Sequence, residues 1–153
     1  MRHRQAIAAL ALVGWFLALY LWLYQLGVGG PLKCGTGGCE IVQTSRWAAL
    51  LGIPVAFYGV VGYAAILTAA LVALQPAWLG RRSPTLLLAA LATGGVLFSA
   101  WLTYLELFVI HAICRWCVTS AVIMTAIWIV ALHALRPTPH APLSRTPAPR
   151  TDP

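Results

Sequence analysis

Residues 6–26 read AIAALALVGWFLALYLWLYQL, an apolar run without a charged residue. About 20 such residues are needed for a helix to cross the hydrocarbon core of a bilayer. A signal peptide also follows basic residues such as Arg2 and Arg4, but its apolar core spans only about 7–15 residues and ends at a small-residue cleavage site. This run is longer, and no good site of that kind follows it. We therefore interpret residues 6–26 as a retained membrane span.

Three further apolar runs follow, at about residues 54–75, 85–110 and 113–135. Across the chain, 61% of residues are hydrophobic, 8% are charged and the mean hydropathy is +0.84. A soluble domain carries about 25% charged residues, so most of this chain faces lipid. The sequence predicts an all-α integral membrane protein, a four-transmembrane-helix bundle formed by residues 1–136. The proline-rich residues 137–153 are predicted to be a disordered cytoplasmic tail.

The net charge of +7 does not indicate nucleic-acid binding, because the basic residues are scattered between apolar runs rather than gathered on one face. In membrane proteins, an excess of Lys and Arg marks the cytoplasmic connections. With four spans, Lys33, Arg46 and Arg115 fall on one side and all the other basic residues on the opposite side. The sequence thus predicts cytoplasmic termini, with the first and third connections on the outer side of the membrane.

The first outer connection is the most polar interior segment, and it contains Cys34 and Cys39 with GTGG between them. Glycine leaves the backbone of such a loop with few steric limits. After Cys39, residues 40–51 are predicted to form a short amphipathic helix at the membrane surface. Trp47 in this segment is suited to the membrane interface.

A second cysteine pair, Cys114 and Cys117, lies in the sequence AICRWCV at the start of the fourth apolar run. On a helix these two residues are i, i+3 neighbours on one face, a placement that permits a reversible disulfide. The partial positive charge of a helix N-terminus favours the thiolate, and Arg115 adds a full positive charge beside the pair. The pattern indicates a reactive dithiol.

The topology argument, which did not use the cysteines, places all four of them on the outer face. Three interpretations are open: two structural disulfides, a four-cysteine zinc site, or a redox relay. We favour the relay, because the outer face of a bacterial inner membrane is an oxidising compartment. The glycine-rich loop suits shuttling between partners, and Cys114 and Cys117 lie at a lipid boundary where a quinone can diffuse. Exchange would proceed by thiolate attack through mixed disulfides.

Together these features resemble the bacterial homologues of vitamin K epoxide reductase, in a stand-alone form without the thioredoxin-like domain that some members carry. The resemblance covers about residues 6–135. It rests on the four cysteines, on SRW at residues 45–47, on GIPV at residues 52–55, and on YLE at residues 104–106 ahead of AICRWC.

The resemblance implies a quinone pocket near the outer surface, inside the four-helix bundle and capped by the half-helix after Cys39. It implies that Cys34 accepts electrons from a separate thioredoxin-fold (DsbA-like) protein and that Cys39 passes them to Cys114. Cys117 would face the quinone, a ubiquinone or menaquinone, and form an adduct or charge-transfer species with it. Ser45 would hydrogen-bond near the quinone or shape its pocket.

The chain departs from the vertebrate members of the family at two places. Cys34 and Cys39 are more closely spaced, and Ala121 stands where the vertebrate members have a tyrosine. The leading hypothesis is a membrane thiol:quinone oxidoreductase that reoxidises an extracytoplasmic thioredoxin-fold partner and supports disulfide bond formation. The alternatives are a quinone or vitamin K epoxide reductase and a non-enzymatic membrane scaffold with structural disulfides.

Four residues near the predicted outer end of the second and third spans are further candidates. The aromatic residues Phe57, Tyr104 and Phe108 could line the quinone pocket, although aromatic residues in membrane helices more often pack or anchor. Glu106 is a charged residue within the third span, where charge is costly and therefore points to function. It is also about one turn from the end of the span, where it could simply reach the interface.

Overall fold

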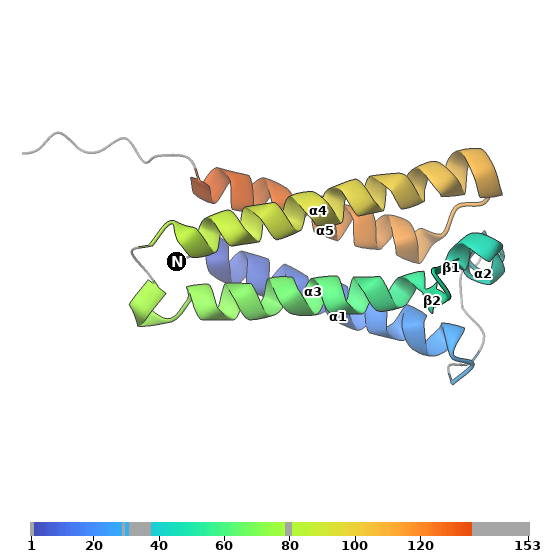
Figure 1. Cartoon of the computed structure of the whole chain (residues 1–153), viewed down its shortest axis with the longest axis horizontal. Coiled ribbons are helices and arrows are strands. Elements are labelled where there is room, and N and C mark those ends of the chain that lie inside the picture. Colours follow the sequence, from blue (N-terminus) through green and yellow to red (C-terminus); the bar gives the residue numbers. More distant parts are fainter. Residues whose placement is uncertain (1, 29, 31–37, 79–80, 136–153) are drawn as a thin grey trace, which may run out of the picture.

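The computed structural model describes residues 2–28, 30, 38–78 and 81–135 of the chain. Four long helices lie side by side along the long axis of the molecule (Figure 1). Each is long and apolar enough to cross a membrane, the third together with the turn that follows it. The predicted four-helix bundle is confirmed, and the chain is a multi-pass membrane protein. The helices are α1 (Arg2–Gln25), α3 (Val55–Ala73), α4 (Ser83–Leu105) and α5 (Arg115–Leu135).

The ends of these helices follow from local sequence. Helix α3 begins directly after Pro54, where a missing backbone N–H costs nothing because it would be unbonded anyway. Helix α4 continues at its C-terminus into a π-helical turn, η3 (Glu106–Ile110). Helix α5 begins at Arg115 rather than Ile113, so Cys114 precedes the helix instead of lying within it.

A buried tyrosine in the core links its own helix to two others. Tyr63 of α3 is fully buried, and its ring lies on Gly14 of α1, where a Cβ atom would come within 2.3 Å of the ring. Its hydroxyl donates a hydrogen bond of 2.9 Å to the backbone oxygen of Ser120 in α5. Only glycine at position 14 lets α1 approach α3 this closely.

Large apolar side chains face outward as well as inward. Phe16 of α1 and Leu97 of α4 are 57% and 67% exposed, respectively. A helix that is apolar all round must be buried in protein or in lipid. These outward-facing side chains therefore form the lipid-contacting surface of the bundle.

One end of the bundle is fastened by Arg4. Its guanidinium donates to the backbone oxygen of Ala73 at the end of α3, and to the backbone oxygens of Trp78 and Arg81 at 3.2 Å each. A fourth bond of 3.2 Å reaches the Thr85 hydroxyl in α4. Carbonyl groups at a helix C-terminus lack intrahelical partners, and a cation there also complements the helix dipole. The start of α1 is thus held against the connection between α3 and α4.

The opposite end carries a cap formed by the segment between α1 and α3 (Figure 1). The short helix expected between the first two spans is present, but its predicted bounds of residues 40–51 are wrong. The cap consists of α2 (Gly38–Thr44), η1 (Arg46–Ala48) and the antiparallel pair β1 (Ala49–Leu50) and β2 (Ile53–Pro54).

Hydroxyl side chains and a turn explain why the helix stops early. Thr44 and Ser45 donate from their side chains to the backbone oxygens of Glu40 and Val42, at 2.7 and 2.8 Å. Such bonds offer the backbone an alternative to continued helix, and Ser45 adopts an extended conformation. Leu51 and Gly52 then both have positive φ, of 54° and 80°, which reverses the chain between the two strands.

Candidate functional site

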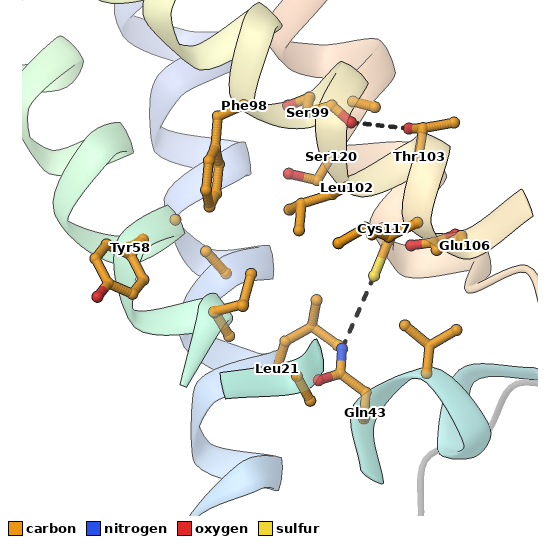
Figure 2. A pocket seen from close by; sticks show the side chains of 18 of the residues that line it. Leu21, Gln43, Tyr58, Phe98, Ser99, Leu102, Thr103, Glu106, Cys117 and Ser120 are labelled. Carbon is orange, nitrogen blue, oxygen red and sulfur yellow. Dashed lines mark hydrogen bonds between the residues drawn. The ribbon is translucent and has the colours of Figure 1, made fainter. Parts of the chain in front are cut away.

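A cavity of about 150 Å³ lies inside the bundle at its capped end. Side chains from all four spans line it, together with residues of α2 and η1 (Figure 2). A cavity of about this size holds a single six-membered ring, as engineered apolar cavities hold benzene. Most of the lining is apolar. The polar lining residues include Gln25, Gln43, Ser45, Glu106, Cys117 and Ser120.

Cys114 and Cys117 meet at the start of α5. The Cys114 carbonyl accepts the Val118 N–H at 2.9 Å, and the Cys114 sulfur accepts the Cys117 N–H at 3.4 Å. These are the two bonds made by the residue that caps a helix N-terminus, with sulfur in place of the usual oxygen. Both cysteines are free thiols, and Cys114 is fully buried.

The thiol of Cys114 is activated by this position. A hydrogen bond from the Cys117 thiol lowers the pKa of Cys114 below its ordinary value, and the backbone N–H groups of Cys117 and Trp116 act in the same direction. Burial and the negative charge of Glu106 oppose this lowering without cancelling it. Cys114 is therefore the more readily ionised thiol at the helix start, as the sequence argument from the helix N-terminus anticipated.

Cys117 presents its sulfur to the cavity between groups from two other elements. The side-chain amide of Gln43 in α2 donates a hydrogen bond of 3.8 Å to the Cys117 sulfur (Figure 2). The Glu106 carboxylate lies beside Cys117 as well and interacts with its thiol (Figure 2). Cys117 is thus the thiol that can reach a molecule held in the cavity.

Cys39 packs with Cys114 but does not line the cavity. Cys39 is fully buried and disulfide-bonded, and it forms one buried cluster with Val42 and Cys114. At the start of α2, Gly38 approaches the backbone of Ile113 so closely that a Cβ atom would come within 2.5 Å of the Ile113 oxygen. This close approach presses the start of α2 against the segment that carries Cys114. The fourth cysteine, Cys34, lies outside the described residues.

Glu106 is positioned by the π-helical turn at the end of α4. Its backbone oxygen accepts the Ala112 N–H at 3.1 Å, and His111 completes the turn with a left-handed φ of 55°. The chain therefore folds back toward Glu106, whose carboxylate accepts the Cys114 N–H at 3.1 Å. The interface alternative for Glu106 is wrong, because the residue is only 4% exposed and its side chain lines the cavity.

A comparison of the sequence with protein families agrees with this arrangement of a buried dithiol beside an apolar cavity. Residues 5–132 match the profile of the vitamin K epoxide reductase family. The chain belongs to the vitamin K epoxide reductase family. Members of this family are oxidoreductases that use thiols to reduce quinones or their epoxides. Membership overturns the alternative of a non-enzymatic scaffold.

A quinone substrate fits the residues of the cavity. The mainly apolar walls suit a quinone ring, and the Cys117 thiol would be the reducing group beside it. Ser45, expected near the quinone, lines the cavity, although its hydroxyl hydrogen is committed to the Val42 carbonyl. The Ser45 oxygen can therefore accept a further hydrogen bond but has no second proton to donate.

The three aromatic candidates do not line the cavity. Tyr104 and Phe108 are 56% and 64% exposed, and their rings pack on each other with centroids 5.0 Å apart. Phe57 packs instead against Trp22, at 5.2 Å between centroids. Residues near them in the sequence do line the cavity. The three aromatic side chains lie on other sides of their helices and point away from it.

Sequence reasoning missed the two glutamines of the cavity. Gln43 falls within the segment expected to form a surface helix, and Gln25 falls near the end of the first apolar run. Gln25 donates from its Nε2 to the Ala48 oxygen at 3.3 Å, while its Oε1 is buried with no hydrogen-bond partner among the described residues. A polar residue at the end of an otherwise apolar run was the available signal.

Proposed function

We propose that the protein is a thiol:quinone oxidoreductase that reoxidises an extracytoplasmic thioredoxin-fold protein and so supports disulfide bond formation. The observation that supports this best is the serial placement of three cysteines. Cys39 is disulfide-bonded and shares a buried cluster with Cys114. The Cys114 sulfur accepts a hydrogen bond from the Cys117 N–H, and Cys117 lines the cavity. Such a series connects a thiol partner outside the bundle to a quinone inside it.

The electrons and protons of this reaction balance over the two cysteine pairs. The dithiol of Cys114 and Cys117 gives two electrons to the quinone and becomes a disulfide, and the quinone takes up two protons to become the hydroquinone. The thiolate of Cys39 then attacks Cys114 in that disulfide and releases Cys117. Cys34 resolves the mixed disulfide by bonding to Cys39. The partner's dithiol reduces the Cys34–Cys39 disulfide and leaves as a disulfide itself.

The charge distribution supports the proposed orientation in a bacterial inner membrane, with both termini in the cytoplasm. Arg4 and Arg81 meet at the end of the bundle away from the cap. The cysteines Cys39, Cys114 and Cys117 lie at the capped end. Because basic residues favour the cytoplasmic side, the capped end faces the periplasm or its equivalent. There the loop cysteines meet an oxidising compartment and its thioredoxin-fold proteins.

The cavity lining favours a quinone over an epoxide as substrate. Ala121, at the position where vertebrate members have a tyrosine, lines the cavity and offers no hydroxyl. Both reactions take two electrons and two protons from a dithiol, but opening an epoxide also needs a hydrogen-bond donor positioned at the ring oxygen, and Ala121 cannot supply one. An assay that offers both substrates separates the two reactions.

The test is quinone reduction by the purified protein in detergent, with a reduced thioredoxin-fold protein as electron donor. Ubiquinone and menaquinone are offered in parallel, and Cys117→Ala is assayed beside the wild type. We expect turnover by the wild type and none by the variant. Folded wild-type protein that reduces neither quinone would overturn the proposal. Full activity in Cys117→Ala would overturn the assignment of the terminal cysteine.

A further inference from the structure

Glu106 is a carboxylate at membrane depth. It lies within the span that runs from Ser83 to Ile110, and only 4% of its surface is exposed. Of the two acidic residues in the described part of the chain, Glu40 and Glu106, only Glu106 lies inside a span. A carboxylate in such a place is costly, and those that occur in membrane proteins commonly pair with other groups or carry protons.

The partners of Glu106 are two cysteines. Its Oε2 accepts the Cys114 N–H at 3.1 Å, and the same carboxylate interacts with the thiol of Cys117. Figure 2 shows the Glu106 and Cys117 side chains next to each other at the cavity wall. The Glu106 carboxylate therefore interacts with the thiol of Cys117, which lines the cavity, and with the backbone of Cys114.

A purely structural role does not require a carboxylate. An acceptor for the Cys114 N–H is all that the turn needs, and the side-chain oxygen of a glutamine would serve equally without placing a charge at membrane depth. A carboxylate differs from that amide in one chemical respect: it can take up a proton and release it again. The residue type thus points to proton transfer rather than to support of the turn.

The thiol chemistry leaves one proton to be moved inside the cavity. Because the Cys117 thiol donates its hydrogen bond to Cys114, the Cys114 thiol ionises first and Cys117 keeps its proton. Reaction of the Cys117 sulfur with a quinone then requires that this proton leave as the sulfur gives up electrons. The buried carboxylate in contact with Cys117 is the base that the site provides.

We propose that Glu106 is the proton carrier of the quinone site, a role that rests on the function proposed above. Glu106 accepts the proton of the Cys117 thiol and transfers it to a quinone oxygen. The two sulfurs supply both electrons and form the Cys114–Cys117 disulfide. The second proton of the hydroquinone comes from water and balances the proton that Cys114 released to water on ionising. Glu106 ends each cycle ionised, as it began.

The test uses single-turnover reduction of a short-chain quinone by fully reduced protein, followed over a range of pH, so that no thiol partner is needed. Glu106→Gln keeps the acceptor for the Cys114 N–H but cannot carry a proton, and Glu106→Asp keeps the carboxylate. General acid–base groups contribute about 100-fold or more to a rate. We expect Glu106→Gln to lose about 100-fold in rate with quinone affinity unchanged, and Glu106→Asp to retain part of the rate.

Glu40→Gln is the matched control, because Glu40 is an exposed carboxylate on α2 and the same change there should leave the rate unchanged. Thiolate absorbance provides a second readout. The charge of Glu106 opposes ionisation of Cys114, so Glu106→Gln should form thiolate at lower pH while reacting more slowly. If Glu106 had only a structural role, the variant would not combine more thiolate at a given pH with a slower reaction.

The outcomes separate the two proposals. Wild-type protein that reduces no quinone would overturn the proposed function and the role of Glu106 together. Active wild type with an equally active Glu106→Gln variant would overturn the proton carrier alone. Glu106→Gln could be slow because it is less stable, which thermal unfolding would reveal. In that case Glu106→Asp decides: it must react faster than Glu106→Leu if the carboxylate carries the proton.

Discussion

The backbone N–H of Cys117 donates to the sulfur of Cys114 at 3.4 Å, so that a reactive thiol also caps the helix that carries its partner. Folding of α5 and activation of the dithiol are therefore linked through one atom. Oxidation of the pair to a disulfide would engage the same sulfur, so the helix start changes its partner during every catalytic cycle.

Replacement of Cys114 separates the two roles of its sulfur. Cys114→Ser keeps a side chain that caps helices well, whereas Cys114→Ala removes the cap, which costs about 1 kcal/mol. We expect both variants to lose dithiol-driven quinone reduction entirely. In thermal unfolding below the folded pKa of Cys114, we expect the serine variant to match the reduced wild type and the alanine variant to unfold at lower temperature.

Cys39→Ser is the companion variant for the relay, because Cys39 shares a buried cluster with Cys114 but does not line the cavity. It should lose turnover with a protein donor. It should still reduce quinone once when Cys114 and Cys117 have been reduced chemically. Retention of wild-type turnover with the protein donor would remove Cys39 from the relay.

The pH dependence of the reduced protein should follow the lowered pKa of Cys114. The hydrogen bond from Cys117 is the main cause of the lowering, and it favours the thiolate in the folded state. Between this lowered pKa and the value of about 8.5 for a free cysteine, the folded state binds fewer protons than the unfolded state. The free energy of unfolding therefore rises with pH across this window and falls as the pH drops through the folded pKa.

The measurement is denaturation of the reduced protein in detergent at a series of pH values, with Cys114→Ser as the control. The wild type should gain stability with rising pH in this window, and the difference from Cys114→Ser should disappear below the folded pKa. An identical pH profile in the two proteins would mean that Cys114 is not the group that titrates.

Much of this fold could be predicted from the sequence, because membrane spans require long apolar runs that composition alone reveals. The cap could not be predicted as well. Its helix ends at Thr44 because the hydroxyls of Thr44 and Ser45 bond back to the preceding turn. Such a choice depends on local side-chain geometry rather than on periodicity. The same periodicity supported a longer helix.

Residues of the cavity could be predicted where their chemistry singled them out. They could not be predicted where the direction of the side chain on its helix determines whether it lines the cavity. The sequence pattern singled out Cys117, Ser45 and Glu106, and all three line the cavity. Tyr104 and Phe108 were chosen for their residue type, yet both face outward. The helical period that places Ser99, Thr103 and Glu106 on the cavity side places Tyr104 on the opposite side of the helix.

Gln43 should assist the sulfur of Cys117. Its side-chain amide donates to that sulfur at 3.8 Å and lines the cavity. Because a donor stabilises a thiolate, Gln43→Leu should slow quinone reduction several-fold, in line with about 1 kcal/mol for one hydrogen bond. Gln43→Glu should slow it more, since a negative charge disfavours the thiolate. Stopped-flow measurements on the reduced protein test this order, and equal rates in both variants would refute it.

Gln25 should distinguish the reduced product from the oxidised substrate. Its Nε2 is held by the Ala48 oxygen, so the group left without a partner among the described residues is Oε1, an acceptor. A quinone has no proton to donate, whereas a hydroquinone has two hydroxyl groups that can satisfy this buried acceptor. Gln25→Leu should therefore weaken hydroquinone binding by about 2- to 10-fold, the worth of one hydrogen bond, with less effect on the quinone. The measurement is product inhibition by added hydroquinone beside the KM for quinone, and equal changes in both constants would contradict the prediction.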